Sequence, residues 1–261
     1  THRGNILVNA PCRAKEIRCG YHARRFDLAG RMTFMPEFTL ARDFPAPSDN
    51  LPQVTFAQWA GQAFASLSPR ASFDSFFGDA LASVAGDPVS QLTYDESRDR
   101  DFEVHANWAL YVENYLEGFH IPFVHAGLDA AVDYSSYSSK LHHLSNLQLA
   151  RDRAGQVAAR YWWVFPNLML NFYPWGLSLN VVEPLAIDLT RVIFRAFVWD
   201  ESKLETGAGA ALDRVEAEDE AIVESVQRGV RSRLYTRGRY SPTRERGVHH
   251  FHQLLCECLA D

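Results

Sequence analysis

The most constraining feature of this sequence is a helical period that runs without a break from Leu212 to Val230. At roughly 100° per residue, its apolar side chains fall within about 60° of one direction, and Asp219 lies at the centre of that direction. The apolar residues are Leu212, Val215, Ile222, Val223, Val226 and Val230. An ionised carboxylate on a buried face needs a metal ion or a cationic side chain. The pattern predicts an amphipathic helix with Asp219 as a metal ligand, or as a buried aspartate that pairs with an arginine or caps a loop.

Strand and helix patterns occupy separate parts of the chain. Residues 158–184 are rich in aromatic and β-branched side chains between prolines, and residues 191–199 have a strong strand pattern. Good helix formers predict another helix over residues 105–120, bounded by Pro122. A short helix is expected at the end of the chain, through Leu254 and Leu255. This segregation predicts an α+β fold.

A proline-rich segment divides the chain. Residues 36–52 contain four prolines, a density that excludes helix and central strand and indicates a connector. Before it, glycines separate short apolar runs at residues 6–8 and 26–28, which we expect to be small strands. We therefore predict two domains, residues 1–45 and residues 46–261.

Composition excludes several classes of function. A chain of 261 residues, 47% of them hydrophobic, can build a sizeable core. Its net charge of -6 gives no general attraction for nucleic acid or an anionic membrane. No apolar run approaches the roughly 18–20 residues of a membrane span, and we expect no secretory leader. Four cysteines are too few for a disulfide framework in a chain this long, which favours the cytoplasm.

Two histidines follow the helix predicted over residues 105–120. His120 and His125 would point about 140° apart on an unbroken helix, but Pro122 lets the chain leave that path. Both imidazoles could then reach one ion, although two ordinary histidines at a helix end have the same spacing. With Asp219 they would form the two-histidine, one-carboxylate triad of non-haem Fe(II) oxygenases, which leaves positions open for oxygen and substrate.

A third group of candidate ligands lies near the start of the chain. A Rieske [2Fe–2S] cluster is held by Cys-x-His and Cys-x2-His pairs, and Cys19 and His22 have the second spacing. His2 would belong to the first pair, whose cysteine would stand just before Thr1. The chain, which starts without methionine, therefore looks truncated within this motif, and by itself it offers three of four cluster ligands. With Cys12, the same residues could instead form a zinc site.

These residues resemble the alpha (oxygenase) subunits of Rieske-type, aromatic-ring-hydroxylating oxygenases. The similar segments are Thr1-His2-Arg3-Gly4, Cys19-Gly20-Tyr21-His22 and Phe26–Gly30 in the Rieske domain; Asn107-Trp108, Glu113-Asn114, Glu117 and His120-x4-His125 in the catalytic domain; and Glu218-Asp219 with Glu224–Gly229 in the carboxylate-ligand helix. They stand in the family's order over nearly the whole chain. The branch of choline and carnitine monooxygenases is more similar than the naphthalene-type dioxygenases.

The resemblance implies a small all-β Rieske domain followed by a catalytic domain of helix-grip, START-like type, with helices covering an antiparallel sheet. It implies a mononuclear Fe(II) on His120, His125 and Asp219, and a [2Fe–2S] cluster whose ligands here are His2, Cys19 and His22. Glu117 would bridge a cluster histidine of one subunit and an iron-ligand histidine of the next in a homotrimer. A reductase or ferredoxin would pass electrons from NAD(P)H, and the substrates would be O2 and a small organic molecule.

Other interpretations of the sequence stay open. Asn114, Trp163 and Phe172 are candidate pocket residues, although aromatic strand residues more often belong to a core. The chain could be a hydrophobic-ligand-binding helix-grip domain without working iron, or a zinc-dependent hydrolase that uses the same triad. The truncated chain alone could be inactive in any case. Neither the substrate nor the choice between mono- and dioxygenation follows from the sequence.

Overall fold

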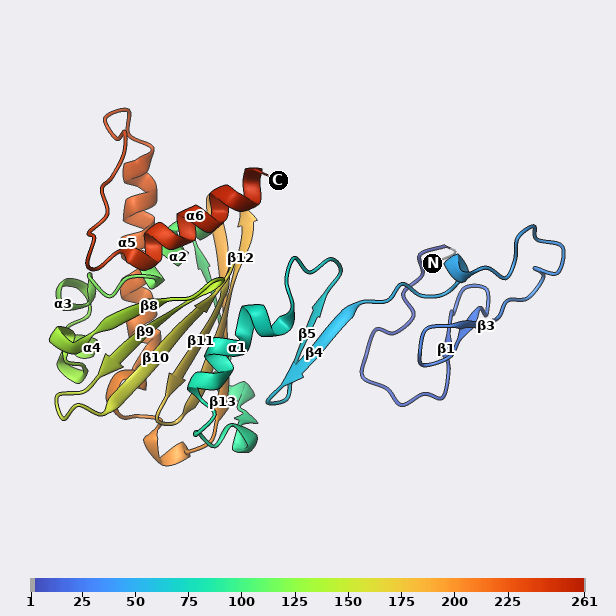
Figure 1. Cartoon of the computed structure of the whole chain (residues 1–261), viewed down its shortest axis with the longest axis horizontal. Coiled ribbons are helices and arrows are strands. Elements are labelled where there is room, and N and C mark those ends of the chain that lie inside the picture. Colours follow the sequence, from blue (N-terminus) through green and yellow to red (C-terminus); the bar gives the residue numbers. More distant parts are fainter. Residues whose placement is uncertain (1–2, 261) are drawn as a thin grey trace. The chain divides into compact units, whose positions relative to one another are not determined.

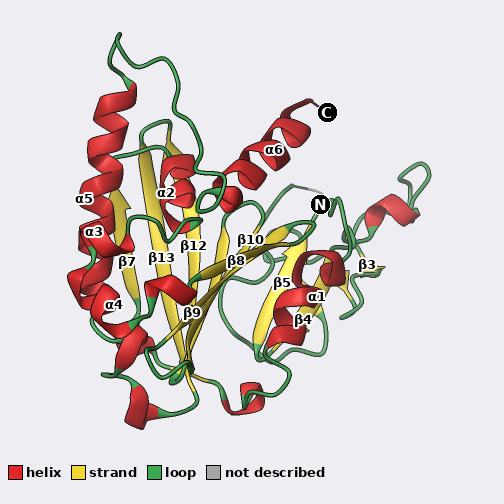
Figure 2. Ribbon diagram, turned by 60° about the vertical axis from the view of Figure 1, so that its left-hand side comes forward, coloured by secondary structure: helices red, strands yellow, loops and turns green. Residues whose placement is uncertain are grey.

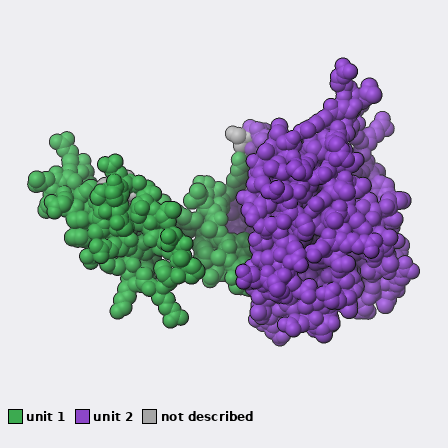
Figure 3. Space-filling view, turned by 180° about the vertical axis from the view of Figure 1, so that it is seen from behind, with its two compact units in different colours: residues 1–70 green, residues 71–261 purple. Residues whose placement is uncertain are grey.

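A computed structural model describes residues 3–260 of the chain (Figure 1). The chain divides into two compact units, residues 1–70 and residues 71–261, which Figure 3 colours separately. The division expected after residue 45 falls inside the first unit, where the backbone N–H of Leu51 donates to the carbonyl of Gly30 and ties the end of the proline-rich segment to the strands before it. The assignment of residues 1–45 and 46–261 to a cluster domain and a catalytic domain stays a prediction.

The first unit is a small β structure. Its antiparallel strands β1, β2 and β3 are followed by the hairpin of β4 and β5. The bounds are β1 Ile17–Arg18, β2 Arg25–Phe26, β3 Met32–Phe34, β4 Thr55–Trp59 and β5 Gln62–Ser66. The prediction of a strand over residues 6–8 was wrong: this segment is irregular and exposed, with Ile6 75% accessible.

The second unit is built on one antiparallel sheet. Its strand order is β6-β13-β12-β11-β10-β9-β8, and β7 also pairs with β13 (Figure 2). The bounds are β6 Thr93–Tyr94, β7 Arg100–Val104, β8 Ser138–Leu141, β9 Ser145–Arg151, β10 Val157–Val164, β11 Leu168–Tyr173, β12 Gly176–Ala186 and β13 Leu189–Val198. The strand expected over residues 191–199 is thus present as β13, and the α+β fold class is confirmed.

Helices cover both faces of this sheet. Trp162 of β10 points to one face, where its indole N–H donates to Ser83 of α1 (2.9 Å), whereas Trp163 points to the other and packs edge-on against Phe251 of α6. Helices α2 and α5 lie on the same face as α6 (Figures 1 and 2). The helix bounds are α1 Phe73–Ser83, α2 Trp108–Tyr115, α3 Ile121–Val124, α4 Ala126–Ala131, α5 Leu212–Val230 and α6 Arg246–Ala260; single 3-10 turns occur at Pro47–Asp49, Val89–Gln91, Glu96–Arg98, Tyr134–Ser136, Glu201–Lys203 and Gly207–Gly209.

The long amphipathic helix predicted over 212–230 is α5, with those bounds. Its buried face is nevertheless rotated from the predicted stripe: Glu216, Val223 and Gln227 are buried, whereas Ile222 and Val226 are exposed. The reason is that the two buried polar side chains have partners on the neighbouring layer. Glu216 accepts from the Tyr111 hydroxyl, and Gln227 accepts from the backbone N–H of Asn107.

The helix expected over 105–120 is shorter, because the chain turns before His120. Asn107 caps the N-terminus of α2, with its side chain accepting from the N–H of Ala109, and the helix ends at Tyr115. After it, the carboxylate of Glu117 accepts from the backbone N–H groups of Phe119 and His120 and holds the turn. Among the described residues, no helix combines the length and apolar character that crossing a membrane requires.

Candidate metal centre

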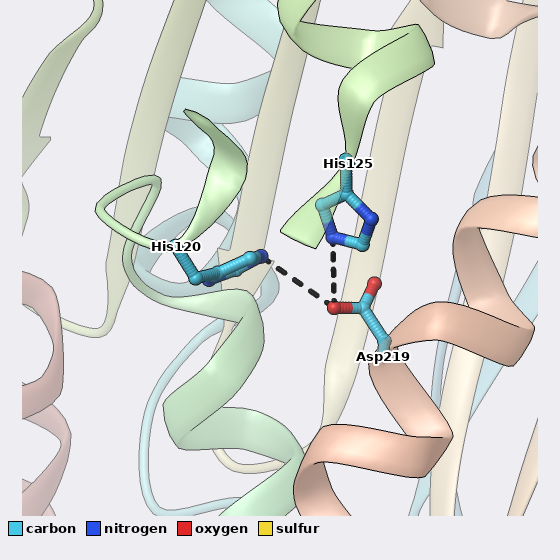
Figure 4. Close-up of side chains that lie close together, drawn as sticks. All are labelled: His120, His125 and Asp219. Atoms are coloured by element: carbon cyan, nitrogen blue, oxygen red, sulfur yellow. Dashed lines mark hydrogen bonds and ion pairs between the residues drawn. The ribbon is translucent and has the colours of Figure 1, made fainter. Parts of the chain in front are cut away.

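Three predicted ligands from separate segments meet beside the sheet. His120 precedes α3, His125 lies between α3 and α4, and Asp219 is on α5 (Figure 4). Nε2 of His125 lies 3.0 Å from Oδ1 of Asp219, and Nε2 of His120 lies 3.5 Å from the same oxygen. Within the described residues, this is the group of three ligand-type side chains whose candidate donor atoms all lie within 4.8 Å of one another.

A break in the chain brings the two histidine rings together. Pro122 stands in the first turn of α3, which is only four residues long. His125 then has a non-helical backbone conformation, with φ -111° and ψ 76°, before α4 begins. The rings of His120 and His125 are 5.0 Å apart at 76° to one another, instead of pointing to different sides of one helix.

Each histidine has a carboxylate at Nδ1, the ring nitrogen that does not face Asp219. Nδ1 of His120 lies 2.6 Å from Oε1 of Glu117, and Nδ1 of His125 lies 2.8 Å from Oε2 of Glu218. A carboxylate on one ring nitrogen fixes the imidazole's tautomer and orientation and leaves the other nitrogen to face an ion. The remaining ligand is oriented as well, because the side-chain amide of Asn114 donates to Oδ1 of Asp219 at 2.6 Å.

The electrostatics of His125 follow from this arrangement. Burial of the ring lowers the pKa of His125, but its hydrogen bonds to the carboxylates of Asp219 and Glu218 outweigh burial, so the pKa lies above the ordinary value. Two imidazole nitrogens and one carboxylate oxygen that face a common point suit a divalent iron ion and leave positions open for further ligands. Zinc accepts the same donor types.

A cavity opens in front of these three side chains, between α2, α5 and the sheet. It has about 720 Å³ of empty volume, part of it open to solvent. The lining that matters for ligand binding combines aromatic side chains with acids: Tyr111, Tyr115, Tyr137, Tyr161, Tyr173, Phe194, Glu117, Glu216 and Asp219. Burial is the largest cause that raises the pKa of Tyr115, Tyr137, Tyr161 and Tyr173, so these phenols stay neutral.

Of the predicted pocket residues, Asn114 lines this cavity, whereas Trp163 and Phe172 do not. Trp163 is on the cavity face of the sheet but is completely buried in the core against α2 and α6. Phe172 stands between Asn171 and Tyr173 on β11, and both of these neighbours line the cavity. Because successive side chains of a strand point to opposite faces, the side chain of Phe172 points to the other face of the sheet. The aromatic residues at the cavity are instead mainly tyrosines.

Sequence reasoning missed Glu216 and its partner Tyr111. Glu216 is 5% exposed, and both its oxygens accept from the Tyr111 hydroxyl, at 2.9 and 2.7 Å. Burial is the main cause that raises the pKa of Glu216 well above its ordinary value. The signal available was the spacing: Glu216 stands one turn before Asp219 on α5, and therefore faces the same way.

The predicted cluster ligands lie in the first unit. His2 is outside the described residues. Cys19 is buried and lies with His22 in the turn between β1 and β2. Hydrogen bonds from the backbone N–H groups of Tyr21 and His22 lower the pKa of the Cys19 thiol, which favours the thiolate form that binds metals. Cys12 is exposed.

Known proteins resemble this chain in sequence. A family model for the catalytic domain of the ring hydroxylating alpha subunit matches residues 89–146 and 130–261. The chain is 28% identical to a chloroplastic choline monooxygenase of Arabidopsis thaliana over 98% of its length and 66% of the relative's. It is 26% identical to the carnitine monooxygenase oxygenase subunit of Escherichia coli K12, over 100% of this chain and 76% of that one. It thus spans slightly less than two thirds of the plant choline monooxygenases that it matches.

Solved structures share the fold. A quaternary ammonium Rieske monooxygenase in complex with an inhibitor superposes with a TM-score of 0.76 at 23% identity, over 98% of this chain and 75% of that one. Naphthalene 1,2-dioxygenase from a Rhodococcus species superposes with a TM-score of 0.67 at 18% identity, over 98% of this chain and 78% of that one. Both are similar in fold to this chain along nearly its whole length.

Proposed function

This chain belongs to the ring-hydroxylating alpha-subunit family, and on that premise we propose that it is the oxygenase component of a Rieske-type non-haem iron oxygenase. The match to the family model confirms the resemblance that the sequence motifs predicted. The proposed reaction is O2-dependent hydroxylation of a small organic substrate. The observation that carries the proposal is the convergence of His120, His125 and Asp219 in the lining of a cavity.

The proposed iron ligands are His120, His125 and Asp219. Bound there, Fe(II) would supply O2 activation, the usual chemistry of this ligand set. The chain's own residues prepare the site. Glu117 and Glu218 hold the two rings with Nε2 directed inward, and Asn114 orients the carboxylate of Asp219.

The cavity walls would position the substrate beside the three ligands and limit the access of water. Tyr161 and Tyr173 of neighbouring strands lie edge-on, 5.9 Å between ring centroids, and present apolar surface next to the site. Because the similar proteins are choline and carnitine monooxygenases, we propose a small quaternary ammonium compound as the substrate. Aromatic faces attract such cations, which supports this choice.

We propose that electrons enter through a Rieske [2Fe–2S] cluster held by His2, Cys19 and His22 with a further cysteine, and that a reductase or ferredoxin delivers them from NAD(P)H. Support comes from the depressed pKa of the Cys19 thiol and from a solved structure of similar fold, a quaternary ammonium Rieske monooxygenase in which electrons pass between subunits. On this basis we propose a homotrimer in which Glu117 links the two redox centres. Because four cysteines are few for a disulfide framework in a chain of 261 residues, we propose a reducing, cytoplasmic location.

The decisive experiment measures metal content, the visible spectrum and substrate-dependent O2 uptake. It uses this chain and a form extended by a cysteine directly before Thr1. We expect iron in both forms and Rieske-type absorption only in the extended one. In the extended form, Asp219→Ala should lose the mononuclear iron and O2 uptake but keep the cluster, while Glu220→Gln, one residue along α5, should keep all three.

Two other functions predict different results in the same experiment. A zinc hydrolase would contain zinc and be colourless. A binding domain without working iron would take up ligand but no oxygen. Full O2 uptake by Asp219→Ala would contradict the proposed ligand set.

A further inference from the structure

The cavity contains a carboxylate that the iron site does not use. Glu216 lines the cavity on the side of α5, and it does not belong to the ligand group of His120, His125 and Asp219. It is almost completely buried. Of the described side chains, only Tyr111 donates hydrogen bonds to it, and that donor is neutral.

The other cavity carboxylates are differently placed. Asp219 has Nε2 of His125 at 3.0 Å and the amide of Asn114 at 2.6 Å, and Glu117 has Nδ1 of His120 at 2.6 Å together with two backbone N–H groups. These acids are therefore matched by groups that belong to the proposed iron site. Glu216 has no comparable partner, since no lysine or arginine lines the cavity among the described residues.

Apart from the two histidines of the proposed iron site, the described residues that line the cavity offer no positive charge either. The hydroxyl of Tyr115 donates to Asn171 at 2.6 Å, and that of Tyr137 donates to Gln148 at 3.2 Å, so these phenols are paired with neutral amides. A buried carboxylate without a cationic partner is costly. A positively charged ligand in the cavity would remove that cost, whereas a neutral ligand of the same shape would not.

We propose that Glu216, oriented by Tyr111, is the residue that selects a cationic group on the substrate. This inference rests on the proposed function and adds to it a single recognising residue. The carboxylate would face the ammonium group from α5 while the tyrosines of the sheet contact its apolar surface. Position on the helix supports this role, since Glu216 stands one turn before Asp219 and would hold the cation beside the proposed iron ligands.

The test compares two ligands of the same shape and different charge. Choline carries a quaternary nitrogen, and 3,3-dimethylbutan-1-ol has a neutral carbon in its place. Dissociation constants are measured by titration calorimetry on the chelator-treated chain, so that the result depends on neither iron nor turnover. We expect the native chain to prefer choline by roughly thirtyfold or more, because a desolvated charge pair is strongly discriminating.

The informative variant is Glu216→Gln, which keeps the shape and a hydrogen-bond acceptor for Tyr111 but removes the charge. It should lose the preference by binding choline more weakly, with unchanged affinity for the neutral alcohol, which also shows that the cavity is intact. The matched control is Glu220→Gln, which removes one charge from the same helix outside the cavity lining and should keep the preference.

Three results would overturn the inference. They are equal affinity for the two ligands in the native chain, no choline binding at all, and loss of the preference in Glu220→Gln as well as in Glu216→Gln. The last would indicate a general field of the acidic helix. None of these results would contradict the proposed oxygenase function, because metal content and O2 uptake test that function separately.

Discussion

Oδ1 of Asp219 accepts a 2.6 Å hydrogen bond from the side-chain amide of Asn114 and also lies 3.0 Å from Nε2 of His125. The amide comes from α2 and the carboxylate from α5, so this contact joins the two helices at the candidate metal centre. Asn114 was expected from the sequence as a pocket residue. It lines the cavity, and it also holds the carboxylate in the direction of the two histidines.

The first prediction concerns this hydrogen bond. Asn114→Ala should weaken iron binding by about 10–100-fold, the usual effect of losing a group that orients a metal ligand. Iron affinity is measured by competition with a chelator of known strength. Asn167→Ala is the control, because Asn167 donates to a backbone carbonyl on the sheet away from the cavity. Equal iron affinity in Asn114→Ala and the native chain would contradict the orienting role.

The second prediction separates the two carboxylates behind the histidines. Glu117→Ala and Glu218→Ala should each weaken iron binding by about 10–100-fold, because each leaves one Nδ1 without its acceptor. If Glu117 also links the two redox centres, only Glu117→Ala should lower O2 uptake per bound iron. The measurement uses the extended, cluster-containing form with iron in excess. Equal uptake per iron in both variants would count against the linking role of Glu117.

The sequence was sufficient where a local pattern decides the structure. The apolar period set the bounds of α5, and the β-branched run located β13. The sequence could also predict that one helix does not carry both His120 and His125, because a proline stands between them. The spacing could not give the conformation at His125 that turns its ring toward His120.

The misjudged residues depend on contacts between layers. The helical pattern assigned Ile222 and Val226 to the buried stripe of α5, but the face that packs is decided by the partners offered by α2, and these suit Glu216 and Gln227. Similarly, alternation along β10 puts Trp163 on the cavity face, but only the position of α6 shows that it is covered there. Such information is absent from any single element.

The third prediction tests the assignment of Trp163 to the core. Trp163→Ala should lower the free energy of unfolding by about 3–5 kcal/mol, the usual effect of emptying a large aromatic site. Denaturant unfolding measures this change. Tyr161→Phe, two residues earlier on the same strand, is the comparison: it removes only a hydroxyl at the cavity and should cost far less. A small effect of Trp163→Ala would indicate that its side chain is not enclosed.

The last prediction concerns the pH dependence of stability that Glu216 creates. Burial raises the pKa of Glu216 well above its ordinary value of 4.5, so between these two values the folded chain holds a proton that the unfolded chain has released. The stability that Glu216 contributes through this proton is therefore fully present below pH 4.5, and it is lost as the pH rises from there through the raised pKa. The buried carboxyl group of Glu216 thus opposes folding at neutral and alkaline pH in the metal-free, ligand-free chain.

Glu216→Gln removes this titration and keeps an acceptor for Tyr111. The variant should be more stable than the native chain by about 1–3 kcal/mol at pH 8, the usual cost of a poorly matched buried polar group, with the difference vanishing below pH 4.5. Thermal unfolding across this pH range measures it. Tyr111→Phe should act in the opposite direction at every pH, because it removes the only side-chain donor that the described residues offer to Glu216. A pH-independent difference between Glu216→Gln and the native chain would mean that the carboxyl does not titrate as a buried group.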